Sequence, residues 1–277
     1  MKPPNITHLE NTIYLVTEET GFGQYDFCFE DHFECRHPHY LDDEITAIAR
    51  MGAAPDYKER YEQMLEFGVK LVHTPEQYGQ TSLLPTWYPL IEEFTPKSIW
   101  YDSPPDFIEI ETNFDYPIFI KGERQTAKHN GNLAIIQDRE HYSKLTEQWK
   151  KDPILWWQRI VCRDFHPLQP AKAKEAQSAM PKSYEFRTFW WKGQCVGIGR
   201  YWVAVDYQLD PSDKPILLEI GKQVTQRIPA PLLVIDFAKT LAGEWIVIEC
   251  NDGQDSGYAG VKAVQMWRNI LDIEQEK

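Results

Sequence analysis

The chain has 277 residues, which is enough for one large domain or two smaller ones with a hydrophobic core. Hydrophobic residues make up 42% of the sequence, and its 10 Trp, 14 Tyr and 13 Phe argue against long disordered stretches. The formal net charge is −13, which excludes a general binder of nucleic acid or of anionic membranes, because such binding needs a basic surface. We therefore expect a globular protein that uses neither nucleic acid nor a membrane as a partner.

The cysteines indicate a reducing compartment. There are five, their number is odd and none forms a C-x-x-C pair, so neither a disulfide framework nor a zinc knuckle is expected. The N-terminus lacks a basic start followed by an apolar run, so we expect no signal peptide. Since no apolar stretch approaches membrane-spanning length, the predicted localisation is the cytoplasm.

Residues 1–113 alternate between short strands and helices, which predicts an α/β domain. The expected strands are residues 12–17, 69–73 and 97–101, and the expected helices are residues 56–66 and the proline-interrupted stretch 76–93. Asp42, Asp43 and Glu44 precede ITAIAR and are typical of an acidic helix start rather than of a metal site. The loop of residues 17–26 carries G-x-G without a third glycine, which gives little support to a dinucleotide site and leaves the loop as a candidate substrate contact.

The pattern changes after residue 113, which predicts a second domain over residues 114–277. A mobile surface loop is expected at residues 167–181, and hairpins are expected around Lys192–Gly193 and Ala242–Gly243. The expected strands are residues 116–121, 133–136, 154–162, 184–191, 195–205, 232–238 and 244–249, and the expected helices are residues 139–150, 216–226 and 260–271.

Polar side chains interrupt two apolar strands near the C-terminus. Asp236 lies within LLVIDFA, Glu249 ends WIVIE, and Asn251 follows two residues later. Taken singly, each is most simply explained as a solvated residue or a weak surface ion pair. Together they offer the oxygen ligands that Mg²⁺ prefers, and Mg²⁺ commonly adds water and substrate phosphates to such ligands. The set therefore predicts a magnesium site on two strands that a short turn would pair.

Basic side chains accompany this acidic set. Lys121, Lys128, Arg187 and Arg200 supply cations of the kind that bind polyphosphate oxygens. Arg187 and Glu185 are two residues apart on one strand, so they share a face. The combination predicts a Mg-nucleotide site between sheets.

The spacing of Asp236, Glu249 and Asn251 resembles the metal-binding end of the ATP-grasp superfamily over roughly residues 114–272. The stretches YEFRTFWWKG and VIECNDGQDSG are similar to those of a bacterial and phage clade marked by one Arg and two Lys, whose members are predicted peptide or amino-acid ligases. The EFR strand also resembles a eukaryotic ATP-grasp protein that chaperones assembly of a translation initiation factor.

The resemblance implies an α+β ATP-grasp fold, with two subdomains that grip ATP, preceded by the N-terminal domain. The lysine-bearing subdomain would span about 114–160 and the metal-binding subdomain about 161–277. The roles that the resemblance implies are nucleotide binding by Lys121, Lys128, Gln158, Arg159, Ile160 and Asp164, catalysis by Arg187 and Arg200, and magnesium binding by Asp236, Glu249 and Asn251. Gln158 and Arg159 stand where many ligases of the superfamily have a glutamate.

The resemblance also implies an activity. The expected enzyme is an ATP-dependent ligase that joins a carboxylate to an amine through an acylphosphate, with ATP and Mg²⁺ as cofactors and small-molecule or peptide substrates. One alternative is an ATP-binding assembly factor that serves a protein partner without ligation. A kinase on the same fold is a further alternative, because it shares the first half-reaction.

Overall fold

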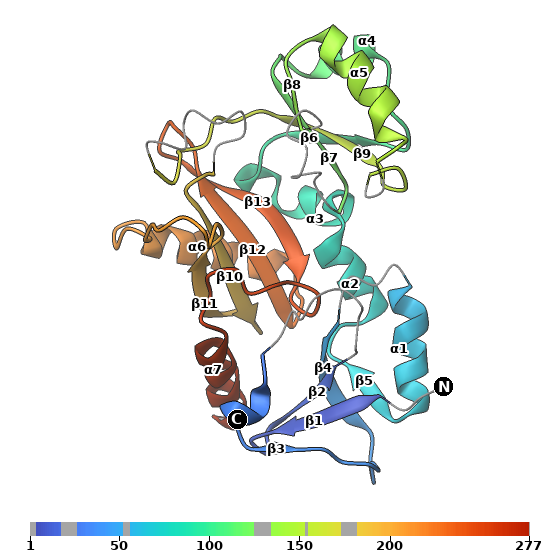
Figure 1. The fold of residues 1–277 in the computed structure, drawn as a ribbon, viewed down its shortest axis with the longest axis vertical. Helices are drawn as coiled ribbons and strands as arrows, with labels where there is room; N and C mark the ends of the chain where they lie inside the picture. Colours follow the sequence, from blue (N-terminus) through green and yellow to red (C-terminus); the bar gives the residue numbers. More distant parts are fainter. Residues whose placement is uncertain are drawn as a thin grey trace. The chain divides into compact units, whose positions relative to one another are not determined.

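The computed structural model describes residues 4–17, 27–51, 56–124, 134–152, 155–172 and 182–276. Helices and strands alternate irregularly, and the described strands form three sheets (Figure 1). The expected α+β class is confirmed. The chain divides into two compact units, of which unit 1 is residues 1–82, 186–236 and 249–277, and unit 2 is residues 83–185 and 237–248.

Unit 1 contains a five-stranded sheet in the order β3-β1-β2-β4-β5. β1 pairs antiparallel with β2 and β3, whereas β4 runs parallel to β2 and β5. Helix α1 packs on β5. The elements are β1 (Asn5–Leu9), β2 (Ile13–Thr17), η1 (Phe29–Asp31), β3 (Cys35–Arg36), β4 (Ile45–Arg50), α1 (Tyr57–Glu66), β5 (Val69–Leu71) and α2 (Pro75–Ser82).

The helix expected at ITAIAR is wrong, because this segment forms β4. Its last four residues are all buried between two parallel neighbours, and a strand covered in this way reads as a continuous apolar run rather than as an alternation. The acidic residues before it therefore precede a strand. The sequence reading also missed β1, whose hairpin with β2 turns through Glu10 and Asn11, both at positive φ.

A four-stranded sheet in the order β11-β10-β12-β13 carries the polar strand residues. The expected hairpin between β10 and β11 is confirmed, and its turn residues Lys192 and Gly193 have φ of 47° and 82°. β11 ends at Arg200, so the expected extension to Val205 is wrong. The elements are β10 (Glu185–Trp191), β11 (Gln194–Arg200), α6 (Lys214–Arg227), β12 (Leu232–Lys239), β13 (Trp245–Asp252) and α7 (Ala263–Gln275).

Unit 2 has its own antiparallel sheet in the order β6-β9-β7-β8. The strand expected over residues 154–162 is wrong at its start, since 155–158 form a turn in which Trp156 and Trp157 are exposed. The elements are α3 (Leu84–Ile91), η2 (Glu92–Phe94), β6 (Ser98–Tyr101), α4 (Phe107–Asn113), β7 (Ile118–Gly122), β8 (Ile135–Ile136), α5 (Arg139–Trp149) and β9 (Ile160–Asp164).

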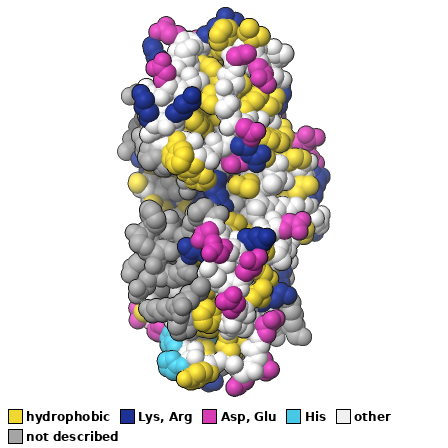
Figure 2. All heavy atoms as spheres, turned by 90° about the vertical axis from the view of Figure 1, so that its right-hand side faces the viewer, with side chains coloured by type: hydrophobic (Ala, Val, Ile, Leu, Met, Phe, Trp, Pro, Cys, Tyr) yellow, Lys and Arg dark blue, Asp and Glu magenta, His cyan; other side chains and the backbone are white. Residues whose placement is uncertain are grey.

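The surface has a mixed charge pattern on the face drawn in Figure 2, where Lys and Arg side chains lie interspersed with Asp and Glu. None of the described helices is both long and apolar enough to cross a membrane. The predicted boundary after residue 113 and the subdomain limits stay predictions.

Candidate functional site

An ion pair between adjacent strands forms the centre of the candidate site. Arg187 of β10 donates from Nε and Nη2 to Oδ1 and Oδ2 of Asp236 on β12, and both distances are 2.8 Å. The side chain of Asp236 is 1% exposed and that of Arg187 is 12% exposed. Arg187 also donates from Nη1 to the Gly257 carbonyl at 2.8 Å, and its guanidinium lies 5.1 Å from the centre of the Tyr201 ring. A planar guanidinium held at three points is fixed in orientation as well as in charge.

The electrostatics of Arg187 bring Glu249 into the same cluster. Burial alone would lower the pKa of Arg187, but the charge of Asp236 and its hydrogen bonds outweigh burial, and the charge of Glu249 adds to them, so the pKa is raised. The guanidinium therefore stays charged. Removing one partner of a buried ion pair of this kind costs about 3–5 kcal/mol, because the other charge is left uncompensated.

Glu249 and Asn251 lie two residues apart on β13, which neighbours β12. Side chains at this spacing share a face of a strand. Nδ2 of Asn251 is buried and has no hydrogen-bond partner among the described residues. Because the oxygen and nitrogen of a carboxamide exchange places by a half-turn of the side chain, an unsatisfied amide here can present its oxygen to a cation.

These three side chains fit a magnesium site with one restriction. No group of three His, Cys, Asp or Glu residues in the described part of the chain is arranged to hold a metal, so the site would rest on two carboxylates and a carboxamide. Both oxygens of Asp236 are engaged by Arg187, and a cation would share that carboxylate with the guanidinium. Mg²⁺ suits such a site, because it binds hard oxygen donors and takes water or phosphate oxygens as its remaining ligands.

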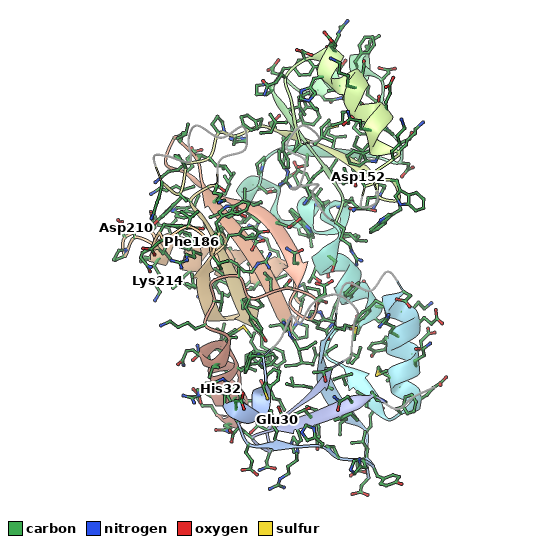
Figure 3. The ribbon with its side chains drawn as sticks, in the orientation of Figure 1. Glu30, His32, Asp152, Phe186, Asp210 and Lys214 are labelled. Carbon is green, nitrogen blue, oxygen red and sulfur yellow. The ribbon has the colours of Figure 1, made fainter. Side chains whose placement is uncertain are left out.

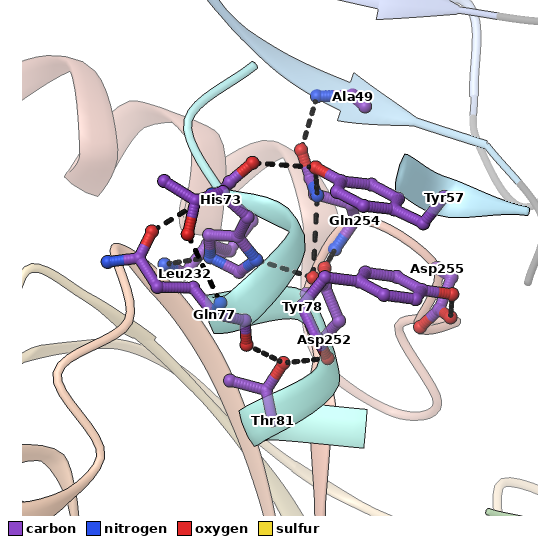
Figure 4. Close-up of polar contacts among 12 residues, drawn as sticks. Ala49, Tyr57, His73, Gln77, Tyr78, Thr81, Leu232, Asp252, Gln254 and Asp255 are labelled. Atoms are coloured by element: carbon purple, nitrogen blue, oxygen red, sulfur yellow. Dashed lines mark hydrogen bonds and ion pairs between the residues drawn. The ribbon is translucent and has the colours of Figure 1, made fainter. Parts of the chain in front are cut away.

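A buried histidine fixes the end of β13, and the sequence reading missed it (Figure 4). The ring of His73 is 0% exposed; its Nδ1 bonds to Oδ2 of Asp252, and its Nε2 lies 3.0 Å from the backbone nitrogen of Leu232. The Leu232 N–H is the donor in the second contact, so Nδ1 carries the proton of the first. His73 thus ties the start of β12 to the end of β13, the two strands that carry Asp236, Glu249 and Asn251.

A second set of bonds closes around Asp252 from the other side. Its Oδ1 accepts a hydrogen bond from the Gln254 backbone at 2.6 Å, and Nε2 of Gln254 donates to the Tyr57 hydroxyl at 3.0 Å. Tyr57 donates in turn to the His73 carbonyl at 2.9 Å, and Oε1 of Gln254 accepts from the Ala49 N–H at 3.0 Å (Figure 4). Both carboxylate oxygens of Asp252 are committed to this network.

Arg50 holds the loop that follows β13. It donates from Nη1 to the Gly253 carbonyl and from Nη2 to the Ser256 carbonyl, and its guanidinium lies 4.9 Å from the centre of the Tyr258 ring. Gly253 itself must be a glycine, because a Cβ there would lie 2.3 Å from the Leu232 side chain. No sequence signal identifies Arg50, because it ends a segment whose acidic start predicts a helix rather than β4.

The predicted phosphate ligand Lys121 belongs to unit 2. Lys121 is buried in β7, opposite Val161 of β9. Lys128 lies outside the described residues, and so does most of the G-x-G loop, at residues 18–26.

The segment expected to edge the adenine is anchored to the residues after β7. Oε1 of Gln158 accepts a hydrogen bond from the Arg124 backbone at 2.9 Å, and Nε of Arg159 donates to Oε2 of Glu123 at 2.6 Å. The Arg159 carbonyl accepts from the Glu123 N–H at 3.0 Å. Ile160 begins β9, between β6 and β7, and Asp164 ends that strand with its N–H donating to the Lys97 carbonyl.

Arg200 does not join the Arg187–Asp236 pair through any described contact. In the register of the hairpin it lies opposite Phe186 rather than Arg187, and Nη1 donates to Oδ1 of Asp206 at 2.7 Å. Alternation along a strand sends neighbouring side chains to opposite faces, so Arg200 and Arg187 face different ways.

Comparison with known proteins gives the fold independent support. The family model described as "ATP-grasp domain, R2K clade family 3" matches residues 97–270, more than half of the chain. No curated protein matches the sequence. Among solved structures, the chain is similar to a D-alanine–D-alanine ligase from Bacillus anthracis complexed with ATP, at 13% identity and a TM-score of 0.57, with 83% of this chain and 79% of the other covered.

Two further structures have the same fold. A RimK domain protein of the ATP-grasp type from Sphaerobacter thermophilus DSM 20745 has 14% identity and a TM-score of 0.56, with 83% of this chain and 81% of the other covered. The VanG D-Ala:D-Ser ligase from Enterococcus faecalis has 14% identity and a TM-score of 0.56, with 83% of this chain and 72% of the other covered. Similarity at such low sequence identity supports a shared fold and does not determine which reaction the chain catalyses.

Proposed function

Because the chain belongs to family 3 of the R2K clade of ATP-grasp domains, we propose that it is an ATP-dependent ligase that joins a carboxylate to an amine. The observation that supports this most is the bidentate Arg187–Asp236 pair with the charge of Glu249 acting on it. A buried guanidinium held among carboxylates is a ready partner for a phosphoryl group and its magnesium. The resemblance of the fold to structures named as D-Ala–D-Ala and D-Ala:D-Ser ligases fits the same activity.

The proposed reaction has two steps. A substrate carboxylate attacks the γ-phosphorus of ATP, and the bond between that phosphorus and the β-γ bridging oxygen breaks. The products of this step are ADP and an acylphosphate. An amine then attacks the acyl carbon, loses a proton, and expels phosphate from a tetrahedral intermediate. Phosphoryl transfer of this kind requires positioning and charge neutralisation from the protein.

We assign the acidic and amide side chains to magnesium and the basic side chains to phosphate oxygens. Asp236, Glu249 and Asn251 would hold Mg²⁺, which would supply positive charge to neutralise the phosphates. Arg187, already oriented by Asp236, would meet the transferred phosphoryl group as its negative charge shifts. Lys121 and Lys128 would neutralise phosphate oxygens. The predicted role of Arg200 is withdrawn, because Arg200 faces away from Arg187 and bonds to Asp206.

The base and ribose would be held by unit 2. We assign the adenine edge to Gln158, Arg159 and Ile160 and the ribose to Asp164. The anchoring of Gln158 and Arg159 to residues 123–124 supports this, because a fixed backbone can offer hydrogen bonds at defined positions. The reaction would take place in the cytoplasm, which fits five cysteines that are all free.

Product analysis tests the proposal. The protein is incubated with Mg-ATP and pools of amino acids and short peptides, and ADP, phosphate and coupled products are followed by chromatography and mass spectrometry. A ligase forms ADP, phosphate and an amide only when an acid and an amine are both present. ATP binding without turnover in any pool, or a phosphorylated product that persists, would contradict ligation and favour an assembly factor or a kinase.

A further inference from the structure

A basic cavity lies beside β11, and its lining residues include none of those that hold ATP or magnesium in the proposed reaction. It has a volume of about 760 Å³ and is lined by β11, by the segment 203–209 and by the first turns of α6 and α7, all within unit 1. This volume falls in the range of roughly 300–1,000 Å³ that is typical of small-molecule sites. Figure 3 labels two residues of this cavity, Phe186 and Lys214, together with Asp210 on the turn before α6.

The charges that line the cavity have one sign. Arg200, Lys214 and Lys262 contribute to its wall, and the described residues that line it include no Asp or Glu. Neither lysine forms an ion pair with a described residue, and Arg200 bonds to Asp206, whose side chain is 80% exposed. Three cations without a lining carboxylate are unexpected in a chain whose net charge is −13.

The N-terminus of α7 adds to the positive potential. Lys214 is the first residue of α6, and Lys262 is the N-cap residue of α7. No side chain caps either helix, so the N-terminal amides of α7 at residues 263–265 are not satisfied by a capping group. A helix N-terminus favours negative charge by itself, and here it strengthens a site that the cavity and the lysines already define.

The remaining wall is apolar and aromatic. Phe186, Val261 and Met266 lie with Tyr207 and Leu218 around the same space. A wall of this kind gives binding energy to a hydrophobic body, while a few placed charges fix its orientation.

From these observations we propose that the cavity between β11 and the first turns of α6 and α7 is a second ligand site, which binds a small organic anion with an apolar body. The negative headgroup lies against Lys214 and Lys262, and the apolar body lies against Phe186, Val261 and Met266. The inference does not depend on the proposed ligase activity, because none of these five residues is assigned to ATP or magnesium.

Cys195 lines the cavity wall, so its thiol can report on what enters the cavity. Burial raises the pKa of this thiol to about 11. Below that pH its labelling rate should rise about tenfold with each unit increase in pH, so rates must be compared at one pH. Cys28 is exposed beside Glu30 and serves as an internal control on the same chain.

The test measures labelling of both thiols by methanethiosulfonate reagents that carry either a sulfonate or a trimethylammonium group, resolved by peptide mass spectrometry. At Cys195 the anionic reagent should react about tenfold faster than the cationic one, whereas at Cys28 the order should reverse. The double variant Lys214→Glu/Lys262→Glu should reverse the preference at Cys195, and the matched control Lys222→Glu, on the exposed face of α6, should keep it. A Cys195 that reacts with neither reagent, or that shows no charge preference, would overturn the proposal.

Occupancy is then measured by protection of Cys195. Benzoate and phenyl phosphate at millimolar concentration should slow labelling by the sulfonate reagent several-fold, and the stronger of the two identifies the headgroup as carboxylate or phosphate. Benzyl alcohol and benzylamine have the same ring without the negative charge and should not protect. The variant Lys214→Met/Lys262→Met should lose protection while keeping the apolar wall. Absence of protection by both anions, or equal protection by benzyl alcohol, would contradict the site.

Discussion

At the residue scale, the positive charge of Arg187 offsets the negative charges of Asp236 and Glu249. Asp236 is buried, and Arg187 satisfies both of its oxygens in this structure. The pairing lets the carboxylate tolerate burial, and a magnesium ion at Asp236 would have to share the carboxylate with the guanidinium. A divalent cation that binds beside Asp236 would supply part of the compensating positive charge that Arg187 otherwise supplies alone.

This balance leads to a prediction for Arg187→Ala. The variant should lose about 3–5 kcal/mol of unfolding free energy without metal, because the Asp236 charge stays buried and unpaired. Added MgCl₂ should then raise its melting temperature more than it raises that of the wild-type protein, since the cation replaces the missing charge. Urea denaturation and thermal melts measure both quantities. The double variant Arg187→Ala/Asp236→Asn is the control and should show no extra magnesium effect; a magnesium effect that persists in the control would refute Asp236 as a ligand.

At the element scale, the predictable part of the site lies on strands whose polar residues break an apolar pattern. Asp236, Glu249 and Asn251 could be found in this way, because a carboxylate in LLVIDFA or at the end of WIVIE contradicts its surroundings. His73 and Arg50 could not, because their partners lie 159 and more residues away and no local pattern records such a distance. The strand at ITAIAR was missed for a related reason: its burial on both sides depends on neighbours that only the fold supplies.

The His73 network should determine how firmly β12 and β13 are joined. We expect His73→Ala to lower the unfolding free energy by about 2–4 kcal/mol, because the Asp252 carboxylate and the Leu232 N–H both lose a buried partner. Hydrogen exchange at the Leu232 amide should accelerate in this variant. His73→Asn, which can still donate to Asp252, should lose less. His39→Ala, at an exposed position before β4, is the matched control and should change stability by no more than about 0.5 kcal/mol. Equal stability of the His73→Ala variant and the wild-type protein would rule out the network as a clamp.

At the scale of the whole molecule, residues from both units are proposed to bind one nucleotide. Lys121 belongs to unit 2, whereas Glu249 belongs to unit 1. A ligand bound only by the folded chain stabilises it by about 2.7 kcal/mol at a hundredfold excess over its dissociation constant, which corresponds to a rise of about 5–10 °C in melting temperature for a chain of this size. Mg-ATP should therefore raise the melting temperature, and chelation of the magnesium should remove most of the increase.

Variants in each unit test whether both contribute. Lys121→Met and Glu249→Gln should each lose most of the stabilisation by Mg-ATP, because the first removes a proposed phosphate contact and the second a proposed magnesium ligand. Lys144→Met is the matched control, since Lys144 pairs with Glu140 on the exposed face of α5, and it should keep the full effect. The two test variants should also separate in their response to magnesium: Glu249→Gln should need more Mg²⁺ for the same shift, whereas Lys121→Met should need more ATP at saturating Mg²⁺. Full stabilisation of either test variant would remove that residue from the proposed site, because a direct contact to the phosphates or the metal cannot be lost without a loss of binding free energy.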